Sequence, residues 1–453
     1  MKRFYISTAI FLFVSLLCFA SKPKYVFYFI GDGMGVNQVH GTEMYRGELA
    51  GRIGIEPLCF TQFPWSAMVT TYSASNGVTD SAASGTALAT GSKTLNHMIG
   101  MTPDSTAVYS VAVRAKQSGA AVAIGTTVSA NHATPGAFYA HQPNREMYYN
   151  IARDMIKADF DFYAGADIQL ESAHAAARDS LYRAMQKAGY TLVRGYDKVA
   201  AATPDAKKMI LFQRPGVSQY SIPYTIDRTD KDMTLAQITQ AAIDVVKEKS
   251  DRGFFMMMEG GRIDQAGHSN DAAANFREVI DFDNAIKVAY EFYKQHPDET
   301  LIVVTADHET GGLILGNSGS YTLNLKVLQN QKVSKDAFYG VLETARKQNP
   351  SITWEEVKKV ITANFGFWDK VKLTEAETQQ LQTIFNKTFK EHTTPLRDAV
   401  VSLLNQKALL GWASGNHSGG YVPVFAIGAG ADRFHGRIDN TDIPKIITEA
   451  AGY

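Results

Sequence analysis

Short apolar runs that alternate with longer helical patterns dominate the chain. The clearest strand-like runs are residues 25–30, 120–126, 254–258, 301–305 and 422–427. Their apolar positions are continuous rather than alternating, which is typical of strands buried on both faces of a sheet. Apolar positions repeat at helical spacing in residues 235–249, 272–293 and 396–410. This alternation predicts an α/β fold, with three α/β/α layers around a central, mostly parallel sheet.

Residues 320–395 differ from the rest of the chain in composition and in the spacing of apolar positions. They are rich in lysine, glutamine, glutamate and threonine, with helical spacing and no run that reads as a buried strand. We interpret them as an inserted helical subdomain, which divides the core into residues 21–319 and 396–453. No internal repeat and no long Pro/Gly/Ser linker marks a further independent domain in the sequence.

The first twenty residues read as a secretory signal peptide, because Lys2 and Arg3 precede an apolar run over residues 6–19. That run is shorter than the roughly 20 residues of a spanning helix. We therefore predict export to the periplasm and no membrane span in the mature chain. An uncleaved anchor and a lipid-modified Cys18 are the alternatives. With Cys18 removed, the mature chain keeps only Cys59 and can form no internal disulfide.

The amino-acid composition is that of a globular protein with balanced charge. Hydrophobic residues make up 45% of the chain and charged residues 20%, which is ordinary for a globular protein and argues against extended disorder. Lysine plus arginine equals aspartate plus glutamate, at 45 each. We therefore expect no nucleic-acid-binding patch and no general attraction to an anionic membrane.

Side chains of metal-ligand type follow four of the predicted strands. In chain order they are Asp32, then His132 and Thr134 in one loop, then Glu259, then Asp307 and His308. Because the carboxyl ends of parallel strands meet at one edge of a sheet, we expect these side chains to converge there.

Asp264 and His268 lie four residues apart, so one helical turn would direct both side chains the same way. His417 stands in the segment S-G-N-H-S-G-G, just before the last predicted strand. Such mixed nitrogen and oxygen ligands suit zinc, and surplus oxygen ligands favour magnesium. The alternative for the Asp264–His268 pair is a surface ion pair. Seven other histidines are interpreted as solvated: His40, His97, His141, His174, His296, His392 and His435.

The segment V-T-D-S-A-A-S-G-T-A-L-A-T-G, residues 78–91, places Asp80 and Ser81 before an alanine-rich helix. The unpaired N–H groups and the positive dipole end of a helix N-terminus favour a bound phosphate, so Ser81 would lie beside an anion site. An ordinary capping serine or aspartate is the alternative.

From about Lys24 to the end, outside the predicted insert, the chain resembles the alkaline phosphatases. The resemblance rests on motifs that occur in the family's order: G-D-G-M-G, V-T-D-S-A-A-S, H-A-T-P followed by Arg145, E-G-G-R-I-D-Q-A-G-H, T-A-D-H-E-T-G-G and N-H-S-G-G. It implies a phosphate-monoester hydrolase that releases inorganic phosphate, and a homodimer.

The resemblance also implies roles for the predicted ligands. One zinc ion would be bound by Asp264, His268 and His417, a second by Asp32, Asp307 and His308, and a magnesium ion by Asp32, Thr134 and Glu259. The two zinc ions would activate the nucleophile and the leaving group. Ser81 would form a phosphoserine intermediate, and the planar fork of Arg145 would bind two phosphate oxygens.

Two positions depart from the best-known bacterial pattern. His132 stands where many bacterial relatives have an aspartate near the magnesium, and Gln265 replaces a charged or aromatic residue near the phosphate. We expect both to contact the substrate. A phosphodiesterase, a sulfatase or a phosphoglycerate mutase of the same superfamily, and a non-catalytic periplasmic protein that binds metal or phosphate, are the alternatives. Arg145, Thr134 and Glu259 favour small-molecule phosphate monoesters.

Overall fold

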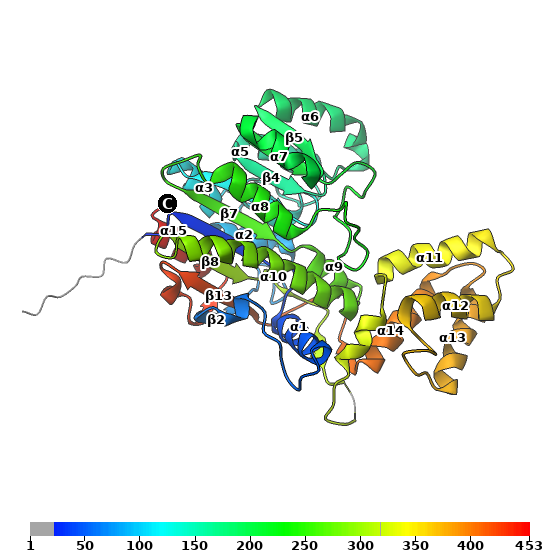
Figure 1. Ribbon diagram of the computed structural model, residues 1–453. Coiled ribbons are helices and arrows are strands. Elements are labelled where there is room, and N and C mark those ends of the chain that lie inside the picture. Colours follow the sequence, from blue (N-terminus) through cyan, green and yellow to red (C-terminus); the bar gives the residue numbers. More distant parts are fainter. Residues whose placement is uncertain (1–21, 318) are drawn as a thin grey trace, which may run out of the picture.

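A ten-stranded sheet runs through the computed structural model of the chain, which describes residues 22–317 and 319–453 (Figure 1). The predicted signal peptide, residues 1–20, lies outside the described residues. From edge to edge the strands are β14 (Gly436–Asp439), β2 (Trp65–Thr70), β13 (Val422–Gly428), β8 (Thr300–Thr305), β1 (Tyr25–Ile30), β7 (Phe254–Glu259), β3 (Ala121–Thr126), β4 (Phe162–Gly165), β6 (Lys208–Phe212) and β5 (Tyr190–Arg194).

Five of these strands coincide with the apolar runs predicted from the sequence, namely β1, β3, β7, β8 and β13. All residues of β1, β3, β7 and β8 are buried, as their continuous apolarity predicted. The prediction missed β2, β4, β5, β6 and β14. Those strands lie toward the two sides of the sheet, and β2 and β14 leave several residues exposed.

The register of the central strands aligns their carboxyl ends. Ile30 of β1 pairs with Glu259 of β7 on one side and with Thr305 of β8 on the other. Thr126 of β3 pairs with Glu259 as well. All four strands are parallel, so the chain segments that follow them leave the sheet side by side at one edge.

One strand in the described sheet, β13, runs antiparallel to its neighbours β8 and β2. Its first residue, Val422, pairs with Val69 near the end of β2, and Phe425 pairs with Val304 near the end of β8. The start of β13 therefore lies at the edge where the parallel strands finish. This reversal brings His417, which precedes β13, to that edge.

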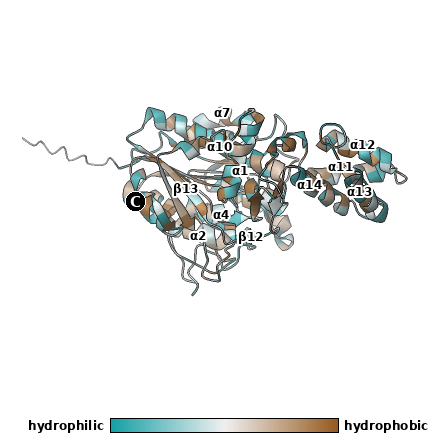
Figure 2. Cartoon of the chain, turned by 90° about the horizontal axis from the view of Figure 1, so that it is seen from below, coloured by the Kyte–Doolittle hydropathy of each residue, from teal (hydrophilic) through white to brown (hydrophobic). Residues whose placement is uncertain are grey.

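Helices cover both faces of the sheet, so the predicted three-layer arrangement is confirmed. Figure 2 shows the sheet nearly edge-on between the two helical layers. On one face α10 (Ala272–Gln295) packs against α1 (Val36–Leu49) and α8 (Leu235–Val246). On the other face α15 (Asp442–Ala451) packs against α2 (Ser81–Thr90) and α3 (Val111–Gln117).

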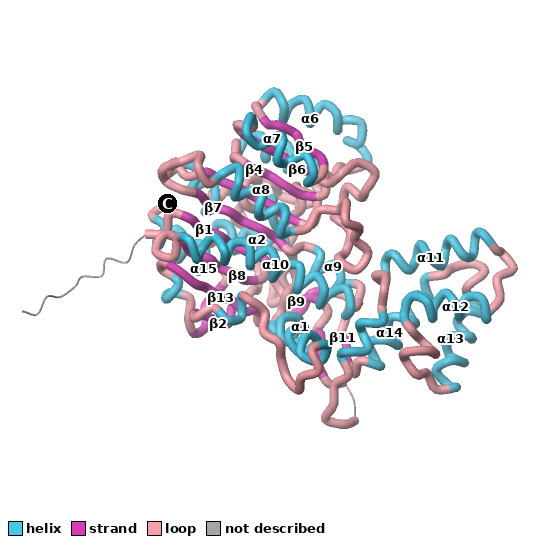
Figure 3. Tube along the Cα trace, viewed as in Figure 1, coloured by secondary structure: helices cyan, strands magenta, loops and turns pink. Residues whose placement is uncertain are grey.

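Four further helices lie beside the sheet, and helices and loops make up this part of the chain (Figure 3). They are α11 (Lys335–Gln348), α12 (Trp354–Phe365), α13 (Glu375–Thr388) and α14 (Thr394–Lys407). Their buried apolar side chains form one cluster with Tyr45 of α1 and Phe276 of α10, and this cluster is separate from that of the main sheet. α14, which the sequence analysis assigned to the core, shares this cluster with α11, α12 and α13. The subdomain boundary at residues 320–395 stays a prediction.

In the described ranges, no helix combines the length and apolarity that a membrane crossing requires.

Candidate active site

Three groups of metal-ligand side chains gather at the carboxyl edge of the sheet. They are group 1 (Asp264, His268 and His417), group 2 (Asp32, Asp307 and His308) and group 3 (Asp32, His132 and Glu259). Within each group, the candidate ligand atoms lie within 4.8 Å of one another. Asp32 belongs to both group 2 and group 3, so the second and third groups are contiguous.

Group 1 has the spacing of a tetrahedral site. Asp264 and His268 share the short helix α9 (Arg262–His268), and His268 Nε2 lies 3.3 Å from Asp264 Oδ2. His417 Nε2 lies 3.2 Å from His268 Nε2 and 3.6 Å from Asp264 Oδ1. Ligand atoms of one tetrahedral zinc ion, each about 2.0–2.1 Å from it, are about 3.3 Å apart. The geometry of group 1 therefore fits one such ion.

The partners of the two histidines of group 1 fix their ring orientation. His268 Nδ1 lies 2.7 Å from the carbonyl oxygen of Gly415, and His417 Nδ1 lies 2.9 Å from that of Thr79. A carbonyl oxygen only accepts, so both Nδ1 atoms carry hydrogen and the two Nε2 atoms face each other. The hydrogen bond with Asp264 raises the pKa of His268 to about 9. Asp264 therefore favours a positive charge beside the His268 ring.

Group 2 is fully buried. His308 Nε2 lies 3.4 Å from Asp32 Oδ1 and 3.2 Å from Asp307 Oδ2. Both carboxylate oxygens of Asp32, and Oδ2 of Asp307, have no hydrogen-bond partner among the described residues. Burial and then repulsion between neighbouring carboxylates raise the pKa of Asp32 and of Asp307 well above the usual range. Such a set of oxygens is stabilised by a divalent cation.

Two residues that the sequence analysis missed support groups 1 and 2. Thr310 Oγ1 donates to Asp264 Oδ1 at 2.5 Å and lies 3.2 Å from His308 Nδ1, so it connects the two groups. Gly33 has a φ of +70°, and a Cβ atom there would lie 2.8 Å from Asp264 Cα. The close approach of two ligand segments therefore requires glycine in the G-D-G-M-G motif.

Group 3 surrounds Glu259. Thr126 Oγ1 donates to one Glu259 oxygen, while the other lies 3.9 Å from His132 Nδ1. Thr134 Oγ1 is buried and has no hydrogen-bond partner among the described residues. Burial raises the pKa of Glu259 to about 7. Burial and the charge of Arg145 lower the pKa of His132 to about 3, so this ring is neutral at pH 7.

The neutral His132 ring orients Arg145. Arg145 Nη2 lies 3.1 Å from His132 Nε2, and because arginine only donates, His132 Nε2 accepts and Nδ1 keeps the hydrogen. Arg145 Nη1 donates to Asp80 Oδ2 at 3.1 Å. The guanidinium is thus fixed from two sides.

Ser81 begins helix α2 and is buried. Its Oγ lies 3.2 Å from His308 Nε2 of group 2. Asp80 caps the helix, because its Oδ1 accepts from the Ala83 N–H at 2.9 Å. One carboxylate therefore fixes both the helix start that presents Ser81 and the guanidinium of Arg145. From the sequence, Asp80 is expected only as a possible cap, although its place directly before Ser81 is a signal for this second role.

The surroundings of Gln265 and of two further histidines differ from those of the three groups. Gln265 accepts a hydrogen bond from Arg262, and the described structure gives it no bond to Ser81 or Arg145, so its contact with substrate stays a prediction. Of the seven histidines interpreted as solvated, His141 and His296 are half-buried. His141 Nδ1 lies 2.7 Å from a backbone carbonyl, and His296 packs on aromatic rings.

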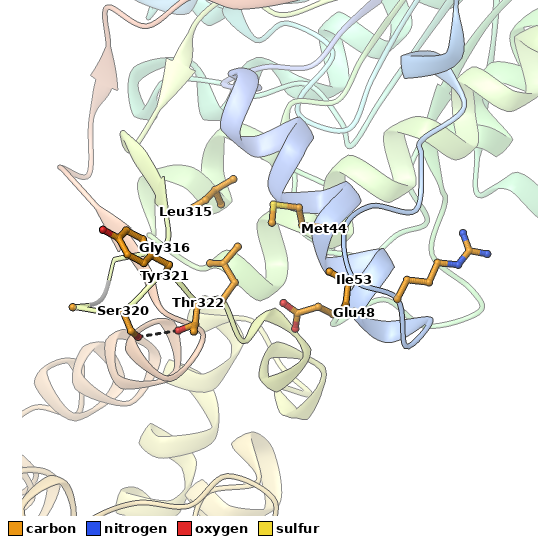
Figure 4. A pocket seen from close by; sticks show the side chains of 12 residues that line it. Met44, Glu48, Ile53, Leu315, Gly316, Ser320, Tyr321 and Thr322 are labelled. Atoms are coloured by element: carbon orange, nitrogen blue, oxygen red, sulfur yellow. Dashed lines mark hydrogen bonds between the residues drawn. The ribbon is translucent and has the colours of Figure 1, made fainter.

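A hollow of about 800 Å³ lies away from these groups. Figure 4 shows Met44 and Glu48 of α1 on one side of it and Leu315 and Tyr321 on the other. Its lining includes none of the predicted site residues.

Buried carboxylates and histidines at a sheet edge, with a serine at a helix N-terminus and a fixed arginine, are the site of a hydrolase with groups of metal-binding residues. A family model described as alkaline phosphatase matches residues 23–453, and the chain belongs to the alkaline phosphatase family. It is accordingly an enzyme of that family.

Relatives cover nearly the whole chain. Alkaline phosphatase 3 of Bacillus subtilis is 32% identical over 435 residues, which are 95% of this chain and 89% of the relative. The crystal structure of the cold-active alkaline phosphatase from the psychrophile Shewanella sp. is 31% identical, with a TM-score of 0.82, and the match covers 94% of this chain and 99% of that one. A histidine-to-aspartate mutant of the TAB5 alkaline phosphatase, with Mg bound in its M3 site, is 25% identical, with a TM-score of 0.68 and coverage of 96% and 99%.

Proposed function

We propose that the chain hydrolyses small phosphate monoesters and releases inorganic phosphate, with Ser81 as the nucleophile. The observation that carries the proposal is the arrangement around Ser81. Its Oγ lies 3.2 Å from His308 at the start of α2, and the same Asp80 that caps this helix orients Arg145. A nucleophile, an anion-binding helix end and a guanidinium fork therefore converge.

We further propose that groups 1 and 2 each bind a zinc ion and that Asp32, Thr134 and Glu259 bind magnesium. The nitrogen and oxygen donors of groups 1 and 2, and the unpartnered buried oxygens of Asp32 and Asp307, support this assignment. The structure of the TAB5 mutant, with Mg bound in its M3 site, supports a magnesium ion in addition to the two zinc ions. When bound, these cations would stabilise negative charge on the attacking and leaving oxygens.

The side chains of the protein would have the following roles in the reaction. Arg145 binds two oxygens of the phosphoryl group, while the free N–H groups at the start of α2 favour its negative charge. Ser81 Oγ attacks phosphorus and the alcohol leaves, which gives a phosphoserine. Water then cleaves the phosphoserine, and phosphate is released. A guanidinium fork prefers a group with several free oxygens, which favours monoesters over diesters.

Export to the periplasm after removal of residues 1–20, assembly as a homodimer, and the helical subdomain at residues 320–395 are further parts of the proposal. N-terminal sequencing of the exported protein and its mass in solution would test the first two. A mature chain that still carries its first residues would overturn the signal-peptide assignment.

The replacement Ser81→Ala tests the nucleophile. We expect hydrolysis of p-nitrophenyl phosphate to fall at least about 10³-fold, because the covalent route is lost, while bound zinc is unchanged by elemental analysis. Ser110→Ala is the matched control, because Ser110 is an equally buried serine at the start of α3 and lies outside the three groups. Turnover near the wild-type rate in Ser81→Ala would contradict the assigned role.

Substrate class is tested on the unmodified enzyme. We expect p-nitrophenyl phosphate to be hydrolysed faster than bis(p-nitrophenyl) phosphate. The opposite ranking would support a phosphodiesterase. Zinc or phosphate binding without hydrolysis of either ester would support a binding protein.

A further inference from the structure

The turn after His268 has a backbone conformation that L-residues rarely adopt. Asn270 has a φ of +50°, in the left-handed region where asparagine is tolerated better than most residues. Its side-chain Nδ2 donates to the carbonyl oxygen of Gly267 at 3.0 Å and to that of Ser414 at 2.8 Å. The first bond closes the end of α9, whereas the second crosses to a distant segment of the chain.

That distant segment carries the other histidine of group 1. Gly415, next to Ser414, accepts the hydrogen bond from His268 Nδ1 at 2.7 Å. Ser414 Oγ accepts from the Asn416 N–H at 3.1 Å, and His417 follows directly. Asn270 and His268 therefore both bind the loop that positions His417.

The helices α11 and α14 bind the same turn from the other side. Asn405 of α14, which is 5% exposed, donates through Nδ2 to the Asn270 carbonyl oxygen at 2.7 Å. Lys335 at the start of α11 donates through Nζ to the Ser269 carbonyl oxygen at 3.0 Å, and its N–H donates to Asp271 Oδ2 at 2.7 Å. The turn is thus bonded both to the metal-ligand loop and to the helical cluster.

We propose that Asn270 is a positioning residue for group 1. By joining the turn after His268 to the loop before His417, its side chain sets the 3.2 Å separation of the two Nε2 atoms and thereby the affinity of group 1 for zinc. A residue that only capped α9 would need the bond to Gly267 alone. The inference rests on the proposed function, in that group 1 is taken to bind zinc.

The variant Asn270→Gly tests this role. Glycine adopts a positive φ without strain, so the turn keeps its backbone while both side-chain bonds are lost. Residues that orient metal ligands typically change metal affinity by about 10–100-fold. We expect one zinc equivalent to bind at least about 10-fold more weakly and the other to keep its affinity, measured by titrating metal-free protein with Zn²⁺ against a chelating indicator. When Co²⁺ is bound in place of Zn²⁺, the intensity of its absorption bands should also be lower in Asn270→Gly than in the wild type.

Two further variants distinguish a positioning role of Asn270 from a general effect on folding. Asn324→Gly is the control, because Asn324 Nδ2, like Asn270 Nδ2, donates to a backbone carbonyl of a distant segment, that of Lys407 at 3.0 Å, away from group 1. It should bind zinc as the wild type does. Asn405→Ala should weaken the same zinc equivalent less than Asn270→Gly, since the bond to Ser414 remains.

Wild-type zinc affinity and an unchanged Co²⁺ spectrum in Asn270→Gly would overturn the inference. An equal loss of both zinc equivalents, accompanied by a lower melting temperature of the metal-free variant, would overturn it too, because it would indicate general unfolding. These readouts do not use ester hydrolysis. A wild-type chain that binds zinc but hydrolyses no ester would therefore refute the proposed function. The comparison of zinc affinity between the wild type and Asn270→Gly would still decide the role of Asn270.

Discussion

At the carboxyl edge of the sheet, buried oxygens of Asp32, Glu259 and Thr134 lack hydrogen-bond partners among the described residues. By contrast, the cluster of α11, α12, α13 and α14 follows the ordinary rules of helix capping and apolar packing. Thr353 and Thr374 form complete capping boxes at the starts of α12 and α13, and the apolar faces of the helices pack against one another. The first region therefore leaves buried polar atoms without partners, whereas the second is stabilised by capped helices and by apolar packing that also includes Tyr45 of α1 and Phe276 of α10.

This contrast predicts that stability and function depend mainly on different parts of the molecule, which are joined by the bonds of Asn405 and Lys335 to the turn after His268. Unpaired buried carboxylates cost free energy unless a cation binds them, so the sheet edge should depend on metal. The helical cluster has a buried apolar core and capped helices, so it should respond to changes in packing and capping.

Metal removal should have the largest effect. An ion present at about 1,000 times its Kd stabilises the folded state by about 4 kcal/mol, and we expect at least two such ions. Treatment with EDTA should therefore lower the melting temperature in calorimetry and abolish hydrolysis. EDTA saturated with zinc is the control. A melting temperature that does not change would show that the carboxylates of groups 1 and 2 are stable without cations, and the contrast would fail.

The replacement Leu342→Ala tests the helical cluster. Leu342 of α11 is fully buried, and its truncation should reduce the free energy of unfolding by about 3 kcal/mol. Zinc affinity and kcat/KM should stay at wild-type values while the protein is folded. Thr344→Ala, at an exposed position of the same helix, is the matched control and should change stability by less than about 0.5 kcal/mol. A large loss of zinc affinity in Leu342→Ala would show that the two regions are not separable.

Arg145→Lys tests the sheet edge without removing charge. Lysine cannot reproduce the fork that contacts Asp80 and His132. The loss of one charge-assisted hydrogen bond should raise the activation free energy by about 2 kcal/mol, which lowers kcat/KM roughly 30-fold. The melting temperature should change little. Arg228→Lys is the control, because Arg228 makes a comparable two-pronged contact with Asp281 outside the three groups. It should lose stability and keep its activity; a loss of activity in both variants would point to a general effect of the substitution.

The central strands could be predicted because residues buried on both faces leave a continuous apolar run, as in β1 and β7. β2 was missed because half of its residues face solvent and its apolarity is interrupted. The reversed direction of β13 could not be predicted, because apolar pattern carries no information about strand orientation. That direction is what brings His417 to the same edge as Asp32 and Asp307.

The candidate ligands could be found from their residue types at strand ends. Thr310 and Asn270 could not, because their contacts with Asp264 and Ser414 join segments that are distant in sequence, and Asp80 was signalled only by its place directly before Ser81. Asp80 contacts Arg145, Thr310 contacts Asp264, and Asn270 contacts Ser414. Such supporting contacts depend on how loops meet in three dimensions, which neither periodicity nor composition records.

The smallest expected effect concerns a single cap in the helical cluster. Thr353 Oγ1 accepts from the Glu356 N–H, and the Glu356 carboxylate accepts from the Thr353 N–H at 2.7 Å. Thr353→Ala removes the cap and should reduce the free energy of unfolding by about 1 kcal/mol in urea denaturation, because a helix N–H loses its partner. Thr353→Ser keeps the oxygen and should stay close to the wild type. The side-chain hydrogen bonds of Thr353 in the described structure are with Glu356, and neither residue belongs to the three groups, so zinc affinity and kcat/KM should be unchanged in both variants. A shift in zinc affinity or in kcat/KM would mean that even one turn of α12 is coupled to the sheet edge, and the two regions would then be a single cooperative unit.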